Sequence, residues 1–289
     1  MDGIELARQL LPPRYLEPRR RAVYEAAEEL RMRPGQALTM VVRGREYPIP
    51  GEAISEEELR RTLEKATGAS LHTAAQALSR GFISYRGLRI GVCGTAVLRN
   101  GELSGFRSFS SLALRIPRAV PGVCDGVYRE MKAGGLANTL IVSPPGGGKT
   151  TALRELIGCF SRDGLRVGVV DERFEIAAAE LGPAQFALGA HCDVLSGVPK
   201  AEGAMMLLRG MNPQVLAMDE ITQREDLAAI RETAGCGVLL LATAHAAGPE
   251  ELRRRELYRQ LLDEGIFSYC LKIRCTERGR SYSLGRLAV

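Results

Sequence analysis

Residues 143–151 have the types and spacing that bind phosphate: Ser-Pro-Pro-Gly-Gly-Gly-Lys-Thr-Thr. Consecutive glycines let backbone N–H groups point into one concavity that side chains would otherwise block. In this pattern the lysine neutralises the β- and γ-phosphates of a nucleotide, and the hydroxyl that follows binds Mg²⁺. The stretch therefore predicts a nucleotide site formed by Ser143, Pro144, Pro145, Gly146, Gly147, Gly148, Lys149, Thr150 and Thr151, with Thr150 as a metal ligand.

One position departs from the P-loop pattern G-x-x-x-x-G-K-[ST], because Ser143 stands where the pattern has glycine. That position shapes the turn and does not touch phosphate. The alternative interpretation is a glycine-rich turn that carries a lysine by chance. The chain has only five lysines among its 289 residues, which argues against chance.

A second group of polar residues, Asp219 and Glu220, ends the apolar stretch 214–219. In P-loop enzymes we expect such a strand to lie beside the P-loop strand, with its terminal aspartate reaching Mg²⁺ through water. Glu220 would then hold the attacking water as general base. An acid pair on a surface turn is the alternative, and the P-loop upstream favours the functional interpretation.

Two further apolar stretches end in residues that can do chemistry. Asp171 and Glu172 follow the first of them, and Thr243 and His245 end the second. Ligands of open α/β sheets bind at the carboxyl ends of the strands, so all these residues are expected at one edge. Either Thr243 or His245 could sense the γ-phosphate or position water, although an ordinary loop imidazole is equally consistent with His245. Four acids at one edge need a divalent cation, so Mg²⁺ is expected, with Asp171 as a further candidate ligand.

The elements that would position these residues alternate from residue 139 onward. Strands are predicted at 139–143, 165–171, 214–219, 237–243 and 266–274, and helices at 149–161, 200–210, 224–234 and 249–263. Such alternation is typical of a mainly parallel sheet with helices on both faces. The predicted fold class is therefore α/β, a P-loop NTPase of the RecA or AAA type.

The first 120 residues predict a smaller α+β domain. A helix is expected over 19–33, a capping box at Ser55 and Glu58 predicts a helix to about 66, and Asn100-Gly101 is a strong hairpin signal. Composition changes at 121–135, which is predicted to be a linker. The P-loop domain then covers 136–289.

Composition indicates a globular protein of the cytoplasm. The chain is 45% hydrophobic and 25% charged, with a net charge of +5, and has neither a 20-residue apolar run nor a signal peptide at its start. Seven scattered cysteines with no C-x-x-C pair indicate reduced thiols. We therefore expect a cytoplasmic protein that reaches the cytoplasmic face of a membrane only through a partner.

Several segments together resemble the stage III sporulation protein AA family of endospore-forming bacteria. They are the P-loop, VGVVDERFEIA at 167–177, PKAEGAMMLLRGMNPQVLAMDEI at 199–221, LLATAHA at 240–246, and the glycine-punctuated stretch 81–118. The resemblance extends from about residue 30 to residue 275. Its most specific parts are the K-A-E-G motif and the D-E-I strand, because the two together are not general to P-loop proteins.

That family is similar to type II and type IV secretion ATPases and to pilus motors. The resemblance implies a homo-oligomer, a hexameric ring, in which the N-terminal domain of one subunit closes on the ATPase domain of the next. It also implies an integral membrane partner and a role in energising a channel from the mother cell into the forespore. By the same resemblance Asp171 and Glu172 match an acidic box that assists catalysis, and His245 matches a histidine box. Arginines of the N-terminal domain would reach the nucleotide, and the candidates are Arg107, Arg115 and Arg118.

Two departures from the family pattern leave other functions open. Thr222 stands where glycine is expected after the D-E-I strand, and Ala246 where glycine follows histidine. A nucleotide-binding scaffold without turnover is therefore one alternative to a Mg²⁺-dependent ATPase. A nucleic-acid-dependent ATPase is another, but 5% aromatic residues and no Trp do not favour base stacking, so no nucleic acid is expected. No N-K-x-D-like segment selects guanine, which favours ATP.

Overall fold

The computed structural model describes residues 3–16, 21–42, 44–68, 81–86, 88–99, 101–116, 121–177, 188–276 and 279–287. These residues fall into two compact units. The described residues up to Ile116 form the first unit, and those from Pro121 onward form the second. Within this described part of the chain, no helix is long and apolar enough to cross a membrane.

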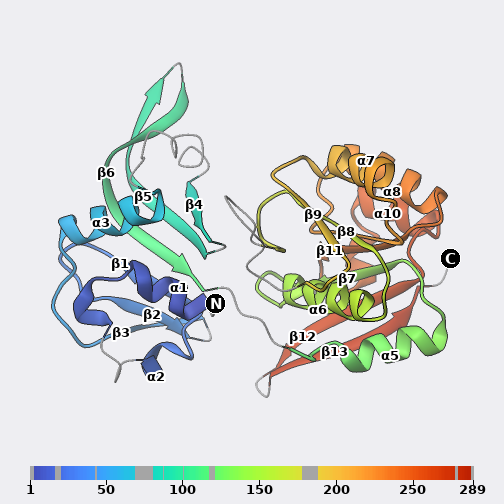
Figure 1. Ribbon diagram of the computed structural model, residues 1–289, viewed down its shortest axis with the longest axis horizontal. Coiled ribbons are helices and arrows are strands. Elements are labelled where there is room, and N and C mark those ends of the chain that lie inside the picture. Colours follow the sequence, from blue (N-terminus) through green and yellow to red (C-terminus); the bar gives the residue numbers. More distant parts are fainter. Residues whose placement is uncertain are drawn as a thin grey trace. The chain divides into compact units, whose positions relative to one another are not determined.

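The first unit is built on a six-stranded antiparallel sheet with helices packed against it (Figure 1). The strand order is β3-β2-β1-β6-β5-β4. Its strands are β1 (Glu29–Met32), β2 (Thr39–Val42), β3 (Arg45–Pro48), β4 (Phe82–Tyr85), β5 (Leu88–Arg99) and β6 (Glu102–Arg115). Its helices are α1 (Gly3–Leu10), the 3₁₀ turn η1 (Pro13–Tyr15), α2 (Arg21–Tyr24) and α3 (Glu56–Ala66).

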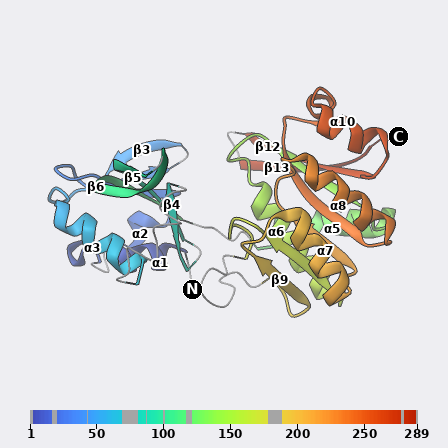
Figure 2. The same ribbon diagram turned by 90° about the horizontal axis from the view of Figure 1, so that it is seen from above.

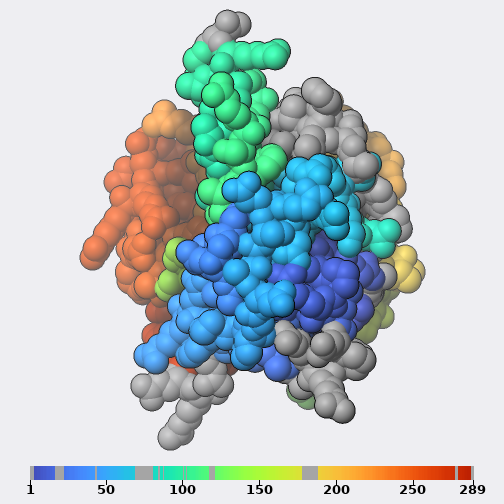
Figure 3. Space-filling model, turned by 90° about the vertical axis from the view of Figure 1, so that its left-hand side faces the viewer, coloured from blue at the N-terminus to red at the C-terminus, as the bar shows by residue number. Residues whose placement is uncertain are grey.

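Two local signals in this unit predicted the right structure. Ser55 accepts a hydrogen bond from the backbone of Glu58, whose side chain accepts one from the backbone of Ser55, and α3 begins there. The turn at residue 101 joins β5 and β6 in a hairpin, with Arg99 opposite Glu102. Figure 3 shows this hairpin projecting from the remainder of the unit.

The predicted helix over 19–33 is wrong. Among the described residues 21–33 only α2 is helical, and β1 occupies Glu29–Met32 between β2 and β6. Leu30 and Met32 point into the core, whereas Glu29 and Arg31 are half-buried on the other face. This alternation and pairing on both edges outweigh the helix propensity of the segment, because propensity differences are below about 1 kcal/mol per residue.

The second unit contains a seven-stranded sheet that is parallel except at one edge. The strand order is β13-β12-β7-β11-β10-β8-β9, and only β13 runs antiparallel to its neighbour. The strands are β7 (Thr139–Ser143), β8 (Val167–Asp171), β9 (Cys192–Ser196), β10 (Val215–Met218), β11 (Leu239–His245), β12 (Tyr269–Thr276) and β13 (Gly279–Arg286). The mainly parallel α/β sheet is confirmed, and β9 and β13 are additions to the five predicted strands.

Helices cover both faces of this sheet (Figure 2). They are α5 (Asp125–Gly134), α6 (Lys149–Arg162), α7 (Lys200–Met211), α8 (Arg224–Gly235), α9 (Pro249–Leu252) and α10 (Glu256–Asp263). The chain passes from β7 through α6 in one direction along the sheet and returns through α7, α8 and α10. Right-handed crossovers therefore put α6 on one face and the other three on the opposite face, where they share one hydrophobic core.

Residues 121–135 belong to the second unit and are not the predicted linker. Helix α5 packs on α6, where the rings of Tyr128 and Phe160 meet edge to face with centroids 5.0 Å apart. The Tyr128 hydroxyl also donates to Asp163 at 2.8 Å. An aromatic pair with a hydrogen bond beside it fixes a helix in place, which a linker does not require.

Candidate nucleotide-binding site

The P-loop links the buried strand β7 to the first turn of α6. Gly146 and Gly148 have φ values of +71° and +101°, which L side chains rarely adopt. A Cβ on Gly147 would lie 2.3 Å from the hydroxyl oxygen of Ser143. Ser143 is buried, and its hydroxyl donates to the Pro144 carbonyl at 2.9 Å. The serine that departs from the motif therefore packs against the loop from inside, and Gly147 provides the space for it.

Four parallel strands bring the predicted polar residues to one edge of the sheet. The order β7-β11-β10-β8 places β11 between the P-loop strand and β10. The expectation that the strand before Asp219 lies directly beside the P-loop strand is therefore wrong. Ser143 is opposite His245, and Met218 is opposite both Ala242 and Val170, so the strands end at one edge.

Asp219 lies between two threonine hydroxyls. Thr243 on the intervening strand donates to its Oδ1 at 2.5 Å, and Thr150 on α6 donates to its Oδ2 at 3.3 Å. The Thr243 oxygen also accepts the backbone N–H of Glu220 at 3.0 Å. Thr243, fully buried, thus orients the Asp219 carboxylate toward Thr150 and fixes the start of the following loop.

Thr150 and Asp219 form a donor set that suits Mg²⁺. The ion prefers oxygen ligands and keeps several waters, so one hydroxyl and one carboxylate suffice beside the phosphates of a nucleotide. Among the described residues no cluster of three or more His, Cys, Asp or Glu could hold a metal by itself. The chemistry therefore fits a metal that arrives with a phosphate ligand.

Lys149, His245 and Glu220 form a chain of contacts. The Lys149 ammonium lies 2.7 Å from His245 Nδ1, and His245 Nε2 lies 3.3 Å from a Glu220 carboxylate oxygen. Because the ammonium can only donate, Nδ1 accepts and Nε2 carries the hydrogen that faces Glu220. Burial lowers the pKa of Lys149, while the carboxylates of Asp219 and Glu220 oppose that shift. The lysine is held at the phosphate site by a neutral group that an anionic phosphate can displace.

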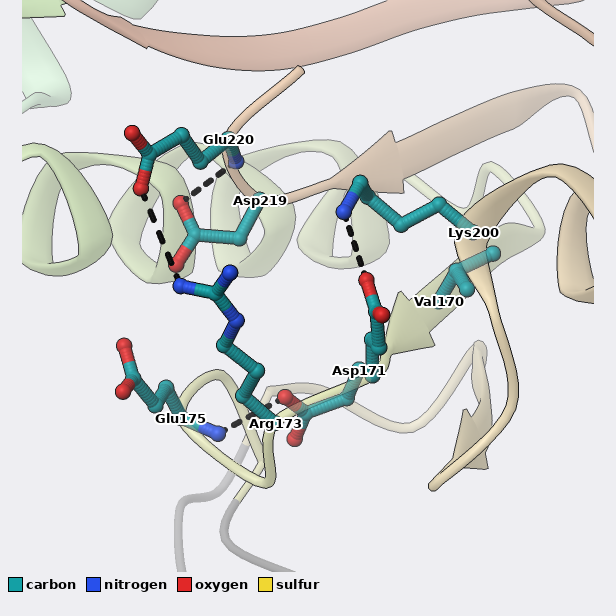
Figure 4. Close-up of a pocket in the computed structure, with 8 residues that line it drawn as sticks. Val170, Asp171, Arg173, Glu175, Lys200, Asp219 and Glu220 are labelled. Atoms are coloured by element: carbon teal, nitrogen blue, oxygen red, sulfur yellow. Dashed lines mark hydrogen bonds and ion pairs between the residues drawn. The ribbon is translucent and has the colours of Figure 1, made fainter. Parts of the chain in front are cut away.

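Figure 4 shows a hollow that is lined by residues at the ends of β8 and β10, Glu220 among them. Arg173 extends across it, and its guanidinium lies 4.0 Å from the Glu220 carboxylate. On the far side Lys200, the first residue of α7, bonds Glu172 at 2.5 Å. Glu172 therefore lies at this edge as predicted, but a buried lysine holds it.

Asp171 anchors the loop that follows β8. One carboxylate oxygen accepts the backbone N–H groups of Glu175 and Ile176 at 2.8 and 2.9 Å, and the other accepts that of Ala177 at 2.8 Å. Arg154 donates to the carbonyls of the same loop, and burial lowers its pKa to about 10. Asp171 is 1% exposed. Its oxygens serve the loop, so the structure favours Thr150 and Asp219 as metal ligands over Asp171.

We expect Asp171→Asn to loosen this loop without changing Mg²⁺ affinity. An amide has one acceptor oxygen where the carboxylate has two, so at least one backbone N–H loses its partner, at a cost of about 1–3 kcal/mol. Hydrogen exchange at the amides of residues 175–177 should become faster, and the Mg²⁺ dependence of nucleotide binding should stay the same. A large loss of Mg²⁺ affinity would instead make Asp171 a ligand.

The arginines that the resemblance suggested lie in the first unit. Arg107 and Arg115 are exposed on β6, and Arg115 lies 3.4 Å from Glu29. Arg118 lies outside the described residues. Their approach to a nucleotide stays a prediction, since it concerns a contact between units or subunits.

Three residues of the site were missed from the sequence. Arg173 and Lys200 lie within the family-like segments 167–177 and 199–221. Arg154 lies on the face of α6 that meets the loop after β8. Spacing four residues beyond the P-loop threonine was the only signal for Arg154. No pattern in the sequence indicates which carboxylate each cation contacts.

The chain is similar over most of its length to proteins of one known family. The family model described as "Sporulation stage III, protein AA" matches residues 9–281. The chain is 33% identical over 252 residues to stage III sporulation protein AA of Bacillus subtilis (strain 168), covering 85% of this chain and 82% of that protein.

Two solved structures share the fold at low sequence identity. The ATPase DotB of Legionella pneumophila matches with a TM-score of 0.63 and 21% identity, over 91% of this chain and 77% of that one. The pilus retraction motor PilT with bound ADP matches with a TM-score of 0.64 and 15% identity, over 93% and 81%. The fold is thus that of P-loop secretion and pilus ATPases, and the chain belongs to the stage III sporulation protein AA family.

Proposed function

We propose that this protein is a Mg²⁺-dependent ATPase that works as a homo-oligomeric motor. The observation that carries the proposal is the set of side chains at one sheet edge: Lys149 and Thr150 on the P-loop helix, with Asp219, Glu220 and His245 within contact distance of them or of each other. Each has the chemistry that phosphoryl transfer needs, and positioning with electrostatics supplies most of its catalysis.

The roles follow from the contacts. Lys149 exchanges its neutral partner His245 for the β- and γ-phosphates of ATP, and the backbone N–H groups of the loop bind the same oxygens. Thr150 and Asp219 would hold Mg²⁺, which neutralises charge on the phosphates when bound. Glu220 accepts the proton of the attacking water, and His245 bridges Glu220 to the lysine that senses occupancy.

The assembly is proposed from the family. We infer a ring, with six subunits as the working stoichiometry, in which Arg107, Arg115 and Arg118 of one subunit approach the nucleotide of the next. The partner is an integral membrane protein of the channel between mother cell and forespore, on whose cytoplasmic face the ring docks. ATP-driven closure and opening of subunits would be passed to that partner.

The first test is steady-state Mg²⁺-ATP hydrolysis per subunit as a function of protein concentration. If neighbouring subunits complete each active site, the rate per subunit should rise with protein concentration and then level off. Lys149→Ala provides the blank, because it removes the cation of the P-loop.

A rate per subunit that is constant over a wide concentration range and absent in Lys149→Ala would contradict the oligomeric motor but keep an ATPase. Nucleotide binding with no turnover above the Lys149→Ala blank, with the membrane partner present, would favour the scaffold. Thr222 and Ala246 raised that alternative. The backbone N–H of Thr222 donates to the Asp226 carboxylate at 3.0 Å, and that of Ala246 donates to the Ser143 carbonyl at 3.2 Å, so hydrogen bonds hold the backbone at both positions.

A further inference from the structure

The hairpin of β12 and β13 extends beyond the P-loop strand. Residues Tyr269–Lys272 of β12 pair with Thr139–Val142 of β7, but β12 continues to Thr276. Strand β13 pairs with β12 over this whole length, with Arg280 opposite Cys275. The hairpin therefore passes alongside the loop that follows β7, and Arg280 lies on the part that overhangs.

Arg280 contacts the outer backbone of the P-loop. Its Nε donates to the Gly147 carbonyl at 3.1 Å, and its Nη2 lies 3.4 Å from the Gly146 carbonyl. A Cβ on Gly148 would lie 3.1 Å from the same Nε. The planar guanidinium fork matches two successive carbonyls, which the point charge of a lysine does not. A permanent cation thus rests directly on the glycine backbone.

These contacts act on the face of the loop that meets phosphate. In a trans peptide the C=O and N–H point in opposite directions. Arg280 therefore binds the Gly147 carbonyl on one side of the peptide, while the N–H of Gly148 points to the other side. Hydrogen bonds in series polarise one another, which makes that N–H a stronger donor. The contacts also order a three-glycine segment whose conformational freedom would otherwise be lost on binding.

We propose that Arg280 is a positioning residue for nucleotide binding. It holds the P-loop in its phosphate-accepting conformation and adds a second positive charge, behind the loop, to that of Lys149. The ligand class is a nucleoside di- or triphosphate, recognised through its β-phosphate. This inference rests on the proposed nucleotide site and assigns a part of it to a strand outside every P-loop motif.

The experiment measures the affinity of the full chain for ADP and for inorganic tripolyphosphate by calorimetry in Mg²⁺ buffer. Arg280→Gln should weaken both ligands about tenfold, the lower range for a hydrogen bond to a charged group. Arg280→Lys should recover part of the loss, since it keeps the charge but not the fork. Arg280 is exposed, so the variants should fold, and thermal unfolding without ligand checks this.

Arg286→Gln is the matched control. Arg286 lies on the same strand and donates to a glycine carbonyl, that of Gly134 at 2.9 Å, but away from the P-loop. Its removal should leave both affinities unchanged. Equal losses in Arg280→Gln and Arg286→Gln would overturn the inference, because they would reflect a weakened β13.

The remaining outcomes separate this inference from the proposed function. Absence of ADP binding by the unmodified chain would overturn the nucleotide site itself. Normal binding by the unmodified chain with equal affinity in Arg280→Gln would overturn the role of Arg280 alone. Weaker ADP binding with unchanged tripolyphosphate binding would also overturn it, because Arg280 would then contact the base or ribose.

Discussion

Glu220→Gln should reduce ATP turnover by about 10²–10⁴-fold, the usual contribution of a general base, while ADP affinity stays within about twofold. Glutamine has nearly the same shape and still accepts the hydrogen of His245 Nε2, so the resting contacts persist. What is lost is the ability to accept a proton from water. Single-turnover hydrolysis and ADP calorimetry on the same preparation measure the two effects.

The contacts of the other acids at this edge favour Glu220 as the proposed base. Asp171 accepts three backbone N–H groups, Glu172 bonds Lys200, and Asp219 lies between Thr150 and Thr243. The Glu220 carboxylate, by contrast, lies 3.3 Å from His245 and 4.0 Å from Arg173. A general base must exchange its resting partner for the attacking water, and this requirement favours Glu220.

Glu225→Gln is the control for that experiment. Glu225 is an exposed acid in the first turn of the next helix, five residues along, and should show normal turnover. Turnover in Glu220→Gln equal to that of the unmodified chain would rule out this base and leave Glu172 as the remaining candidate. Loss of ADP binding in Glu220→Gln would mean that the carboxylate orders the site and does not act on water.

The P-loop and the acidic strand were predictable because their chemistry is local. Three glycines, one lysine and one threonine must be consecutive for one loop to bind phosphate, so the sequence alone identifies them. Alternating strands and helices likewise indicated the parallel sheet. Glu172 and His245 were placed at the same edge because each follows or ends an apolar stretch, and the family resemblance added their roles.

The strand order and the contacts within the site depend on interactions between distant segments. Which strand lies between β7 and β10 is a matter of topology, and the assignment of Thr243 to Asp219 follows only from that order. Arg280 lies on a mostly polar strand in which only Tyr282 and Leu284 are half-buried, and two alternating positions are too few to predict either the strand or its approach to Gly147. The helix prediction for 19–33 failed for a similar reason, since β1 pairs with the distant β6 as well as with the nearby β2.

Lys200→Met should destabilise the second unit by about 3 kcal/mol, as expected when one partner of a buried ion pair is removed. Lys200 and Asp226 are only 6% and 3% exposed, and the ammonium lies 3.9 Å from the Asp226 carboxylate. Asp226 also caps α8 by accepting the backbone N–H groups of Thr222 and Gln223. Methionine fills the same space but leaves that buried carboxylate without its cation.

Urea unfolding of the full chain gives the size of this effect, and hydrogen exchange of α8 assigns it to the second unit. Lys132→Met is the matched control, because Lys132 pairs with Asp163 at 2.6 Å on the surface, where such a pair contributes at most about 1 kcal/mol. Both variants remove one lysine from an ion pair with an aspartate. Equal losses would show that burial of the Lys200 pair has no energetic consequence.

The double variant Lys200→Met with Asp226→Asn separates the buried charge from packing. The amide is neutral and its oxygen still accepts from the start of α8, so more than half of the lost stability should return. Glu172 should remain released in both variants, because its bond to Lys200 is absent. If turnover stays low while stability recovers, Lys200 positions Glu172 for catalysis. If turnover recovers with stability, the lysine acts on folding alone and the acidic box needs no support from it.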